Sequence, residues 1–157
     1  MHKQELLRTA ALIPQATKTD LAEHAAKRDE LVAKLNTLML DRPDIVELVG
    51  ENNLTLMQDN HANHARFVES YLQNPNPEML VETVLWVFRS YRSRGFQPPY
   101  WSAQLNGWVE LLKKELSPEG YKPVYPLYHW LIVNLPAFTL LSDETLEATD
   151  NFVPSHG

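Results

Sequence analysis

Residues 54–72 decide the fold class, and they read Leu-Thr-Leu-Met-Gln-Asp-Asn-His-Ala-Asn-His-Ala-Arg-Phe-Val-Glu-Ser-Tyr-Leu. Apolar and aromatic side chains recur here at the three- and four-residue spacing of a helix, which places them on one stripe. The stripe also contains two histidines, and its members are Leu54, Met57, His61, His64, Val68, Tyr71 and Leu72. Because an apolar stripe packs against a core, we expect both imidazoles to face the core.

The segments that precede this helix carry the signals of further helices. Thr17 followed by Asp20 resembles a capping box, which marks the start of a helix. Helices are expected over residues 3–12, about 17–39, and 43–49, and Gly50 is expected to end the last of them. The inward positions of the second helix are predicted to be Leu21, Ala25, Leu31, Leu35 and Leu38.

The segments that follow are also helical in pattern. Asn76 can cap a helix that has Pro77 in its first turn, and Gly95 suits the left-handed residue that ends it. Its inward stripe is Val81, Val84, Leu85, Phe88 and Tyr91, and that of the next helix is Trp101, Leu105, Trp108, Leu112 and Leu116. A last helical region covers about residues 121–141, with a kink or break at Pro136.

No stretch alternates polar and apolar residues with the period of a strand, so the sequence predicts an all-α fold. We expect one helical bundle of five to seven helices over residues 1–141, for which a globin-like arrangement is one version. Residues 142–157 have little apolar periodicity and are expected to form a loose C-terminal tail.

Composition removes several classes of function. The net charge of −6 argues against a nucleic-acid partner, which needs a basic face. The absence of cysteine excludes disulfides, iron–sulfur clusters, thiolate zinc sites and cysteine nucleophiles. The polar start of the chain does not resemble a signal peptide, and the apolar-rich run over residues 125–141 is too interrupted to predict a membrane span. We therefore expect a cytoplasmic protein.

The two histidines allow three interpretations. Both could be core-edge residues that hydrogen-bond to backbone groups or tyrosine hydroxyls. They could instead line a pocket for an organic ligand. They could also bind a metal ion, but helical metal sites need further ligands, which would come from another helix, for example His129 or His24.

The functional expectations follow from His61 and His64 and from the many aromatic residues in the second half of the chain. The leading hypothesis is a non-catalytic ligand-binding or sensory module whose pocket is lined by His61, His64, Trp86, Tyr91 and Trp130. The alternative is a protein-interaction or assembly module, such as a homodimer, without a small ligand. A metal-dependent enzyme using His61, His64 and His129 comes third, because no motif of a known catalytic site is present.

Residues 54–116 resemble the helical-bundle module of cobalamin-dependent sensors and methyltransferases. The resemblance runs from His61–Phe67, through the turn at Asn74-Pro75, to a helix that contains Trp86 and ends in Arg94-Gly95. It implies a helical module for sensing or docking, with cobalamin as an implied cofactor, although the α/β cobalamin domain of that family is missing from this chain. Helical globin-like sensor domains are similar in length, and for them His61, His64 or His129 could serve as an axial ligand to haem.

Overall fold

A computed structural model describes residues 2–145 of the chain, where every regular element is a helix and no strand is present. The predicted all-α class is therefore confirmed. The described residues form nine helices rather than five to seven, because a short helix follows the sixth helix and the last predicted region is divided in two. The helices are α1 (His2–Ala10), α2 (Ala22–Leu40), α3 (Ile45–Val49), α4 (Leu54–Gln73), α5 (Pro77–Arg92), α6 (Pro98–Glu115), α7 (Pro118–Tyr121), α8 (Tyr125–Val133) and α9 (Leu135–Thr145).

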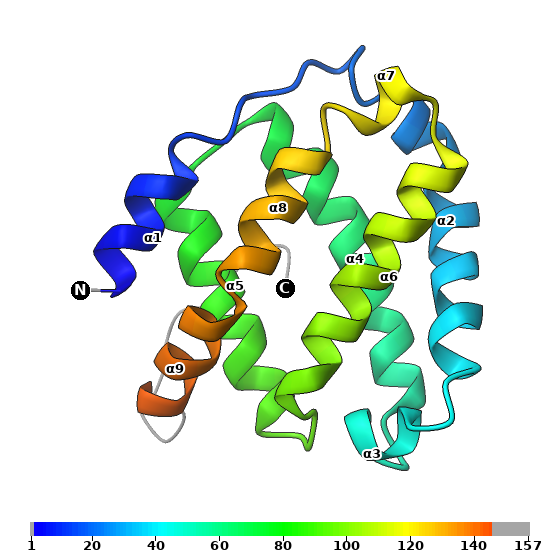
Figure 1. Ribbon diagram of the computed structural model, residues 1–157, viewed down its shortest axis with the longest axis vertical. Helices are drawn as coiled ribbons and strands as arrows, with labels where there is room; N and C mark the ends of the chain where they lie inside the picture. Colours follow the sequence, from blue (N-terminus) through cyan, green and yellow to red (C-terminus); the bar gives the residue numbers. More distant parts are fainter. Residues whose placement is uncertain (1, 146–157) are drawn as a thin grey trace.

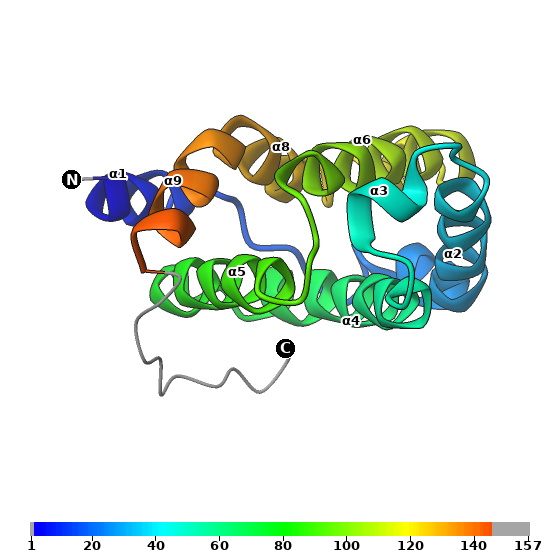
Figure 2. The ribbon, with the colours of Figure 1, turned by 90° about the horizontal axis from the view of Figure 1, so that it is seen from below.

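The helices are arranged in two layers. Figure 2 shows α4 and α5 in one layer and α6 and α8 in the other, with α2 closing one end and α1 and α9 the opposite end. The link between α1 and α2 crosses the edge of the bundle (Figure 1). It is fixed to the end of α4 by the hydrogen bond from Ala16 N to Leu72 O, 2.9 Å long. The apolar core lies between the two layers of helices.

The capping box predicted before α2 is present. Thr17 N donates to Asp20 Oδ2 over 2.9 Å, and Asp20 N donates to Thr17 Oγ1 over 3.0 Å. The predicted inward face of α2 is only partly correct. Leu21, Leu31 and Leu35 are buried, whereas Ala25 is exposed and Leu38 is 44% exposed.

A buried polar pair explains why the inward face of α2 differs from the predicted one. His24 is buried on this helix, and its Nδ1 lies 2.6 Å from Oε2 of Glu69 on α4. Arg28 also donates to Glu69, over 2.7 Å. The side chain of Glu69 is therefore buried between α2 and α4. The periodicity of apolar residues does not reveal such a pair, and the inward positions predicted from it for α2 were therefore partly wrong.

The predicted signals at both ends of α5 are confirmed. Asn76 Oδ1 accepts a hydrogen bond from Met79 N over 3.1 Å, and Pro77 is the first residue of the helix. Gly95 has a φ of 110°, a backbone conformation that residues other than glycine rarely adopt. Phe96 N donates to Tyr91 O, as in a Schellman ending. The predicted stripes of α5 and α6 are buried at every position.

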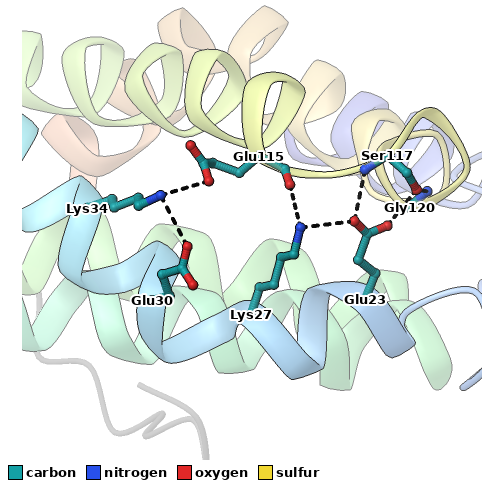
Figure 3. A network of polar contacts seen from close by, with 7 residues as sticks. All are labelled: Glu23, Lys27, Glu30, Lys34, Glu115, Ser117 and Gly120. Carbon is teal, nitrogen blue, oxygen red and sulfur yellow. Dashed lines mark hydrogen bonds and ion pairs between the residues drawn. The ribbon is translucent and has the colours of Figure 1, made fainter.

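A charged network outside the core holds α2 to the junction of α6 and α7 (Figure 3). Glu23 accepts hydrogen bonds from Ser117 N and Oγ over 2.9 and 2.6 Å. Lys27 donates to Glu115 O over 2.7 Å, and Lys34 donates to Glu115 Oε1 over 2.8 Å. The hydrogen bonds from Ser117 hold the pKa of Glu23 below its usual value. This network sets the position of α2 against the rest of the bundle.

The last helical region divides at Asn134, and Pro136 is the second residue of α9, as the predicted break requires. α9 continues to Thr145, four residues beyond the predicted end of the bundle domain. Arg92 on α5 fixes this end, because it donates to Ser142 Oγ over 2.8 Å and pairs with Asp143. The remainder of the predicted tail, residues 146–157, lies outside the described residues.

Across residues 2–145, no helix combines the length and the apolar character that crossing a bilayer requires.

Candidate functional site

His61 lies in the middle of α4 and is fully buried. Its Nδ1 is 2.6 Å from Asn36 Oδ1 on α2, and its Nε2 is 3.0 Å from the Tyr100 hydroxyl on α6. Tyr100 in turn donates to Asn60 Oδ1 over 2.8 Å, and Gln104 Nε2 lies 3.4 Å from the same oxygen. These residues form the His61 network, which joins α2, α4 and α6 through paired polar groups.

His64, one turn further along α4, is half-buried and lies in a different environment. Its Nε2 is 2.7 Å from the Tyr128 hydroxyl on α8. Its ring stacks on Trp108, with the ring centroids 5.4 Å apart. Both histidines thus face the core and bond to tyrosine hydroxyls, as the first of the three interpretations expects.

Burial controls the charge of this region. It lowers the pKa of both His61 and His64 to about 3, so both are neutral at pH 7. It raises the pKa of Tyr100 and Tyr128 well above the ordinary value, so both phenols keep their protons. The site is therefore a set of neutral donors and acceptors.

A cavity of about 70 Å³ opens beside His64, between the two layers of the bundle. On a scale where one water molecule takes about 10–15 Å³, it has room for about five waters. Its wall is mostly apolar and comes from α4, α5, α6 and α8. The lining residues are Asn60, Asn63, His64, Phe67, Thr83, Val84, Val87, Phe88, Trp101, Gln104, Leu105 and Leu131.

The structure brings one of the five predicted pocket residues to this wall, namely His64. His61 is one turn away in its own network. Trp86 is half-exposed on α5, outside the wall. Tyr91 is buried and packs edge-on against Trp101, with centroids 5.8 Å apart. Trp130 donates its indole N–H to Thr9 Oγ1 over 2.9 Å and faces α1 instead.

Two polar residues of the wall, Asn60 and Gln104, were missed from the sequence. Asn60 precedes His64 by four residues and so shares its helix face, which is a signal that the sequence does contain. Gln104 lies three residues after Trp101 and four before Trp108, so its position on the buried face of α6 was also a signal in the sequence. Their roles depend on how α4 and α6 are rotated against each other.

The predicted metal ligands do not come together. Among residues 2–145, no group of three or more histidine, aspartate or glutamate side chains could hold a metal ion. His129 is exposed on α8, where its ring lies 5.9 Å from that of Tyr125. His24 Nδ1 lies 2.6 Å from Glu69 Oε2, and His24 belongs to no group of three or more potential metal ligands among the described residues.

The residues present do not fit a corrin or a porphyrin. The cavity has room for about five waters, and either macrocycle is several times larger. Both ring nitrogens of His61 are already hydrogen-bonded, and so is Nε2 of His64. In this conformation neither histidine is available as an axial ligand.

In comparisons with known proteins, no protein-family model, no curated protein and no solved structure matches the chain. The resemblance to cobalamin-dependent and globin-like sensor modules therefore stays a prediction.

Proposed function

We propose that this protein is a non-catalytic binding module that holds a small organic ligand in the cavity beside His64. The observation that carries the proposal is the cavity itself, since an apolar wall with a few polar groups is typical of small-molecule sites. Cores are otherwise packed with few voids larger than a water molecule. A cavity of this size at the junction of four helices is therefore a natural place for a ligand.

The surroundings of the cavity favour binding over catalysis. The wall contains no aspartate, glutamate, lysine or arginine, and His64 is neutral at pH 7. A general acid or base needs a pKa near the working pH, and the imidazole is far from that range. A ligand that fills the space would stabilise all four helices, and a sensory response would follow from that coupling.

The experiment is retention of a small molecule by the native protein. Purified protein is incubated with a metabolite extract, washed, measured by native mass spectrometry and then denatured to release what it holds. We expect a mass excess that vanishes on denaturation. Val84→Phe places a larger side chain in the cavity, so this variant should retain nothing while its circular dichroism is unchanged. No retained compound in the wild type, or equal retention by Val84→Phe, contradicts the proposal.

A second candidate function, self-association, is favoured by one surface groove. The groove lies between α1 and α8, and three of its lining residues are unusually exposed for apolar side chains, namely Leu12 at 71%, Val133 at 55% and Tyr125 at 41%. No charged residue lines it. Because the chain has a net charge of −6, two copies repel each other least through an uncharged face. We propose a second copy of this chain as the occupant.

Sedimentation equilibrium over a hundredfold range of concentration tests this candidate. We expect a dimer that dissociates in the variant Leu12→Asp with Val133→Asp. The matched control is Leu40→Asp, because Leu40 is also exposed but lies on α2, away from the groove. A wild-type monomer at every concentration contradicts self-association.

A further inference from the structure

His64 has only half of its hydrogen-bonding capacity in use. Its Nε2 is bonded to Tyr128, and no group within residues 2–145 bonds to its Nδ1. His64 forms part of the cavity wall, so Nδ1 is the ring nitrogen left for a ligand. Tyr128 is buried, and His64 is the partner of its hydroxyl among the residues that the structure describes.

The single proton of the Tyr128 hydroxyl determines the tautomer of His64. If Nε2 carried the ring proton, it would donate to the tyrosine oxygen and leave the phenolic proton buried without an acceptor, which costs free energy. If Tyr128 donates its proton to Nε2, both groups are satisfied and the ring proton lies on Nδ1. The neutral His64 therefore presents an N–H donor to the cavity.

Two of the other acceptors in the wall, Asn60 Oδ1 and Asn63 Oδ1, are already in use. Asn60 Oδ1 accepts from Tyr100 and lies near Gln104 Nε2, and Asn63 Oδ1 accepts from Arg66 over 2.5 Å. The indole N–H of Trp101, another wall residue, is buried and has no partner within residues 2–145. The wall thus has N–H donors to spare.

Charged ligands are disfavoured in this wall. An ion that enters it loses its hydration and meets no opposite charge, since no side chain with a formal charge lines the cavity. The volume of about 70 Å³ suits a molecule of about five to seven non-hydrogen atoms, if each takes the roughly 10–15 Å³ of one water.

On the basis of the binding function proposed above, we infer that the ligand is a small neutral molecule with a hydrogen-bond acceptor, such as a cyclic ketone. Its oxygen accepts the hydrogen bond from Nδ1 of His64. Its apolar ring packs against the side chains of Val84, Leu105 and Leu131. The acceptor gives the site its selectivity, because an apolar ring alone would leave the His64 donor without a partner.

Two probes of the same ring size separate the inference from the function on which it rests. Dissociation constants for cyclopentanone and cyclopentane are measured by ¹H–¹⁵N NMR titration of the full chain. We expect cyclopentanone to bind at least tenfold more tightly than cyclopentane. If neither probe shifts the resonances of the cavity residues, the proposed function is overturned. If both bind equally, the function stands and the acceptor inference is overturned.

The variant His64→Leu removes the donor and should reduce the preference for cyclopentanone to about onefold. Trp86→Phe is the matched control, because Trp86 lies on α5 outside the wall, and it should keep the tenfold preference. A tenfold preference that persists in His64→Leu overturns the inference. The ¹⁵N chemical shifts of His64 in the wild type provide a test that needs no variant. We expect a protonated Nδ1, and a protonated Nε2 would overturn the inference.

Discussion

His61 and His64 lie on the same face of α4, three residues apart, yet their surroundings differ in kind. Both ring nitrogens of His61 have partners, from α2 and from α6, and His61 is not among the residues that line the cavity beside His64. His64 has one partner, from α8, and borders a cavity. In the proposed function, the same residue type serves two purposes on one helix: His61 fixes helix packing, and His64 offers a hydrogen bond to a ligand.

Lowering the pH tests a property that both histidines share, namely that each is neutral in the folded protein. This change has the largest expected effect on the free energy of unfolding. Each histidine has a pKa of about 6.5 in the unfolded chain and about 3 in the fold, so the unfolded state binds more protons between these values. The stability that the neutral imidazoles contribute is therefore present above pH 6.5 and is lost as the pH falls toward 3. Between pH 6.5 and 4.5 we expect the free energy of unfolding to fall by about 5 kcal/mol, at about 1.4 kcal/mol per pH unit for each histidine.

Urea denaturation at a series of pH values measures this loss. The window above pH 4.5 isolates the histidines, because carboxylates with lowered pKa, such as Glu23 and Asp44, lose their contribution only below it. His64→Gln removes one of the two titrating groups and should halve the slope. A stability that stays flat down to pH 4.5 would show that the histidines are not buried in neutral form.

Deleting the tyrosine hydroxyl that bonds each histidine distinguishes their contributions to stability. The hydroxyl belongs to Tyr100 for His61 and to Tyr128 for His64. Tyr100→Phe deletes a hydroxyl that bonds both Asn60 and His61, so two buried groups lose a partner. Each unsatisfied buried group costs about 1–3 kcal/mol, and we expect a total loss of about 2–3 kcal/mol in the free energy of unfolding. Chemical denaturation gives the value. A loss below about 1 kcal/mol would mean that the His61 network does not hold α4 to α6.

The sequence predicted much of the fold because most inward positions of α5 and α6 are apolar, with Thr83 and Gln104 as the buried polar residues of these helices. It misjudged α2, where Ala25 and Leu38 are exposed, because the buried pair of His24 and Glu69 sets the rotation of that helix. A prediction from local periodicity assigns polar residues to the surface. Only the tertiary structure reveals that His24 and Glu69 are paired and buried.

The site was less predictable for a related reason. His64 could be identified because it occupies a position in an apolar stripe. Trp86 and Trp130 were assigned to the same pocket from their residue type, but side-chain type does not specify how α5 and α8 rotate about their axes. The cavity arises from the separation of the two layers, a property of four helices together that no single segment of sequence encodes.

The exposed charged network offers a contrast to both buried regions. A Cβ atom built on Gly120 would lie 2.2 Å from Glu23 Oε1, so Gly120→Ala must displace Glu23 from Ser117 (Figure 3). Solvent can replace those hydrogen bonds, and we expect the melting temperature to fall by only roughly 2–4 °C. The control is Gly107→Ala, whose Cβ would meet the flexible methyl groups of Leu35 and Leu38 at 3.2 Å. A larger fall for Gly107 than for Gly120 would contradict a role for Glu23 in placing α2.

A similarly small change in stability is expected from Tyr128→Phe, which deletes the partner of His64. One buried nitrogen loses its hydrogen bond, and we expect a loss of about 1 kcal/mol, less than half of that for Tyr100→Phe. The tautomer of His64 should respond more than the stability does. Without the donated phenolic proton, nothing holds the ring proton on Nδ1, so ¹⁵N NMR should show a mixture of both tautomers. If Tyr128→Phe costs as much as Tyr100→Phe and leaves His64 a single tautomer, the two histidines are fixed equally, and the distinction between a structural and a ligand-facing imidazole on α4 fails.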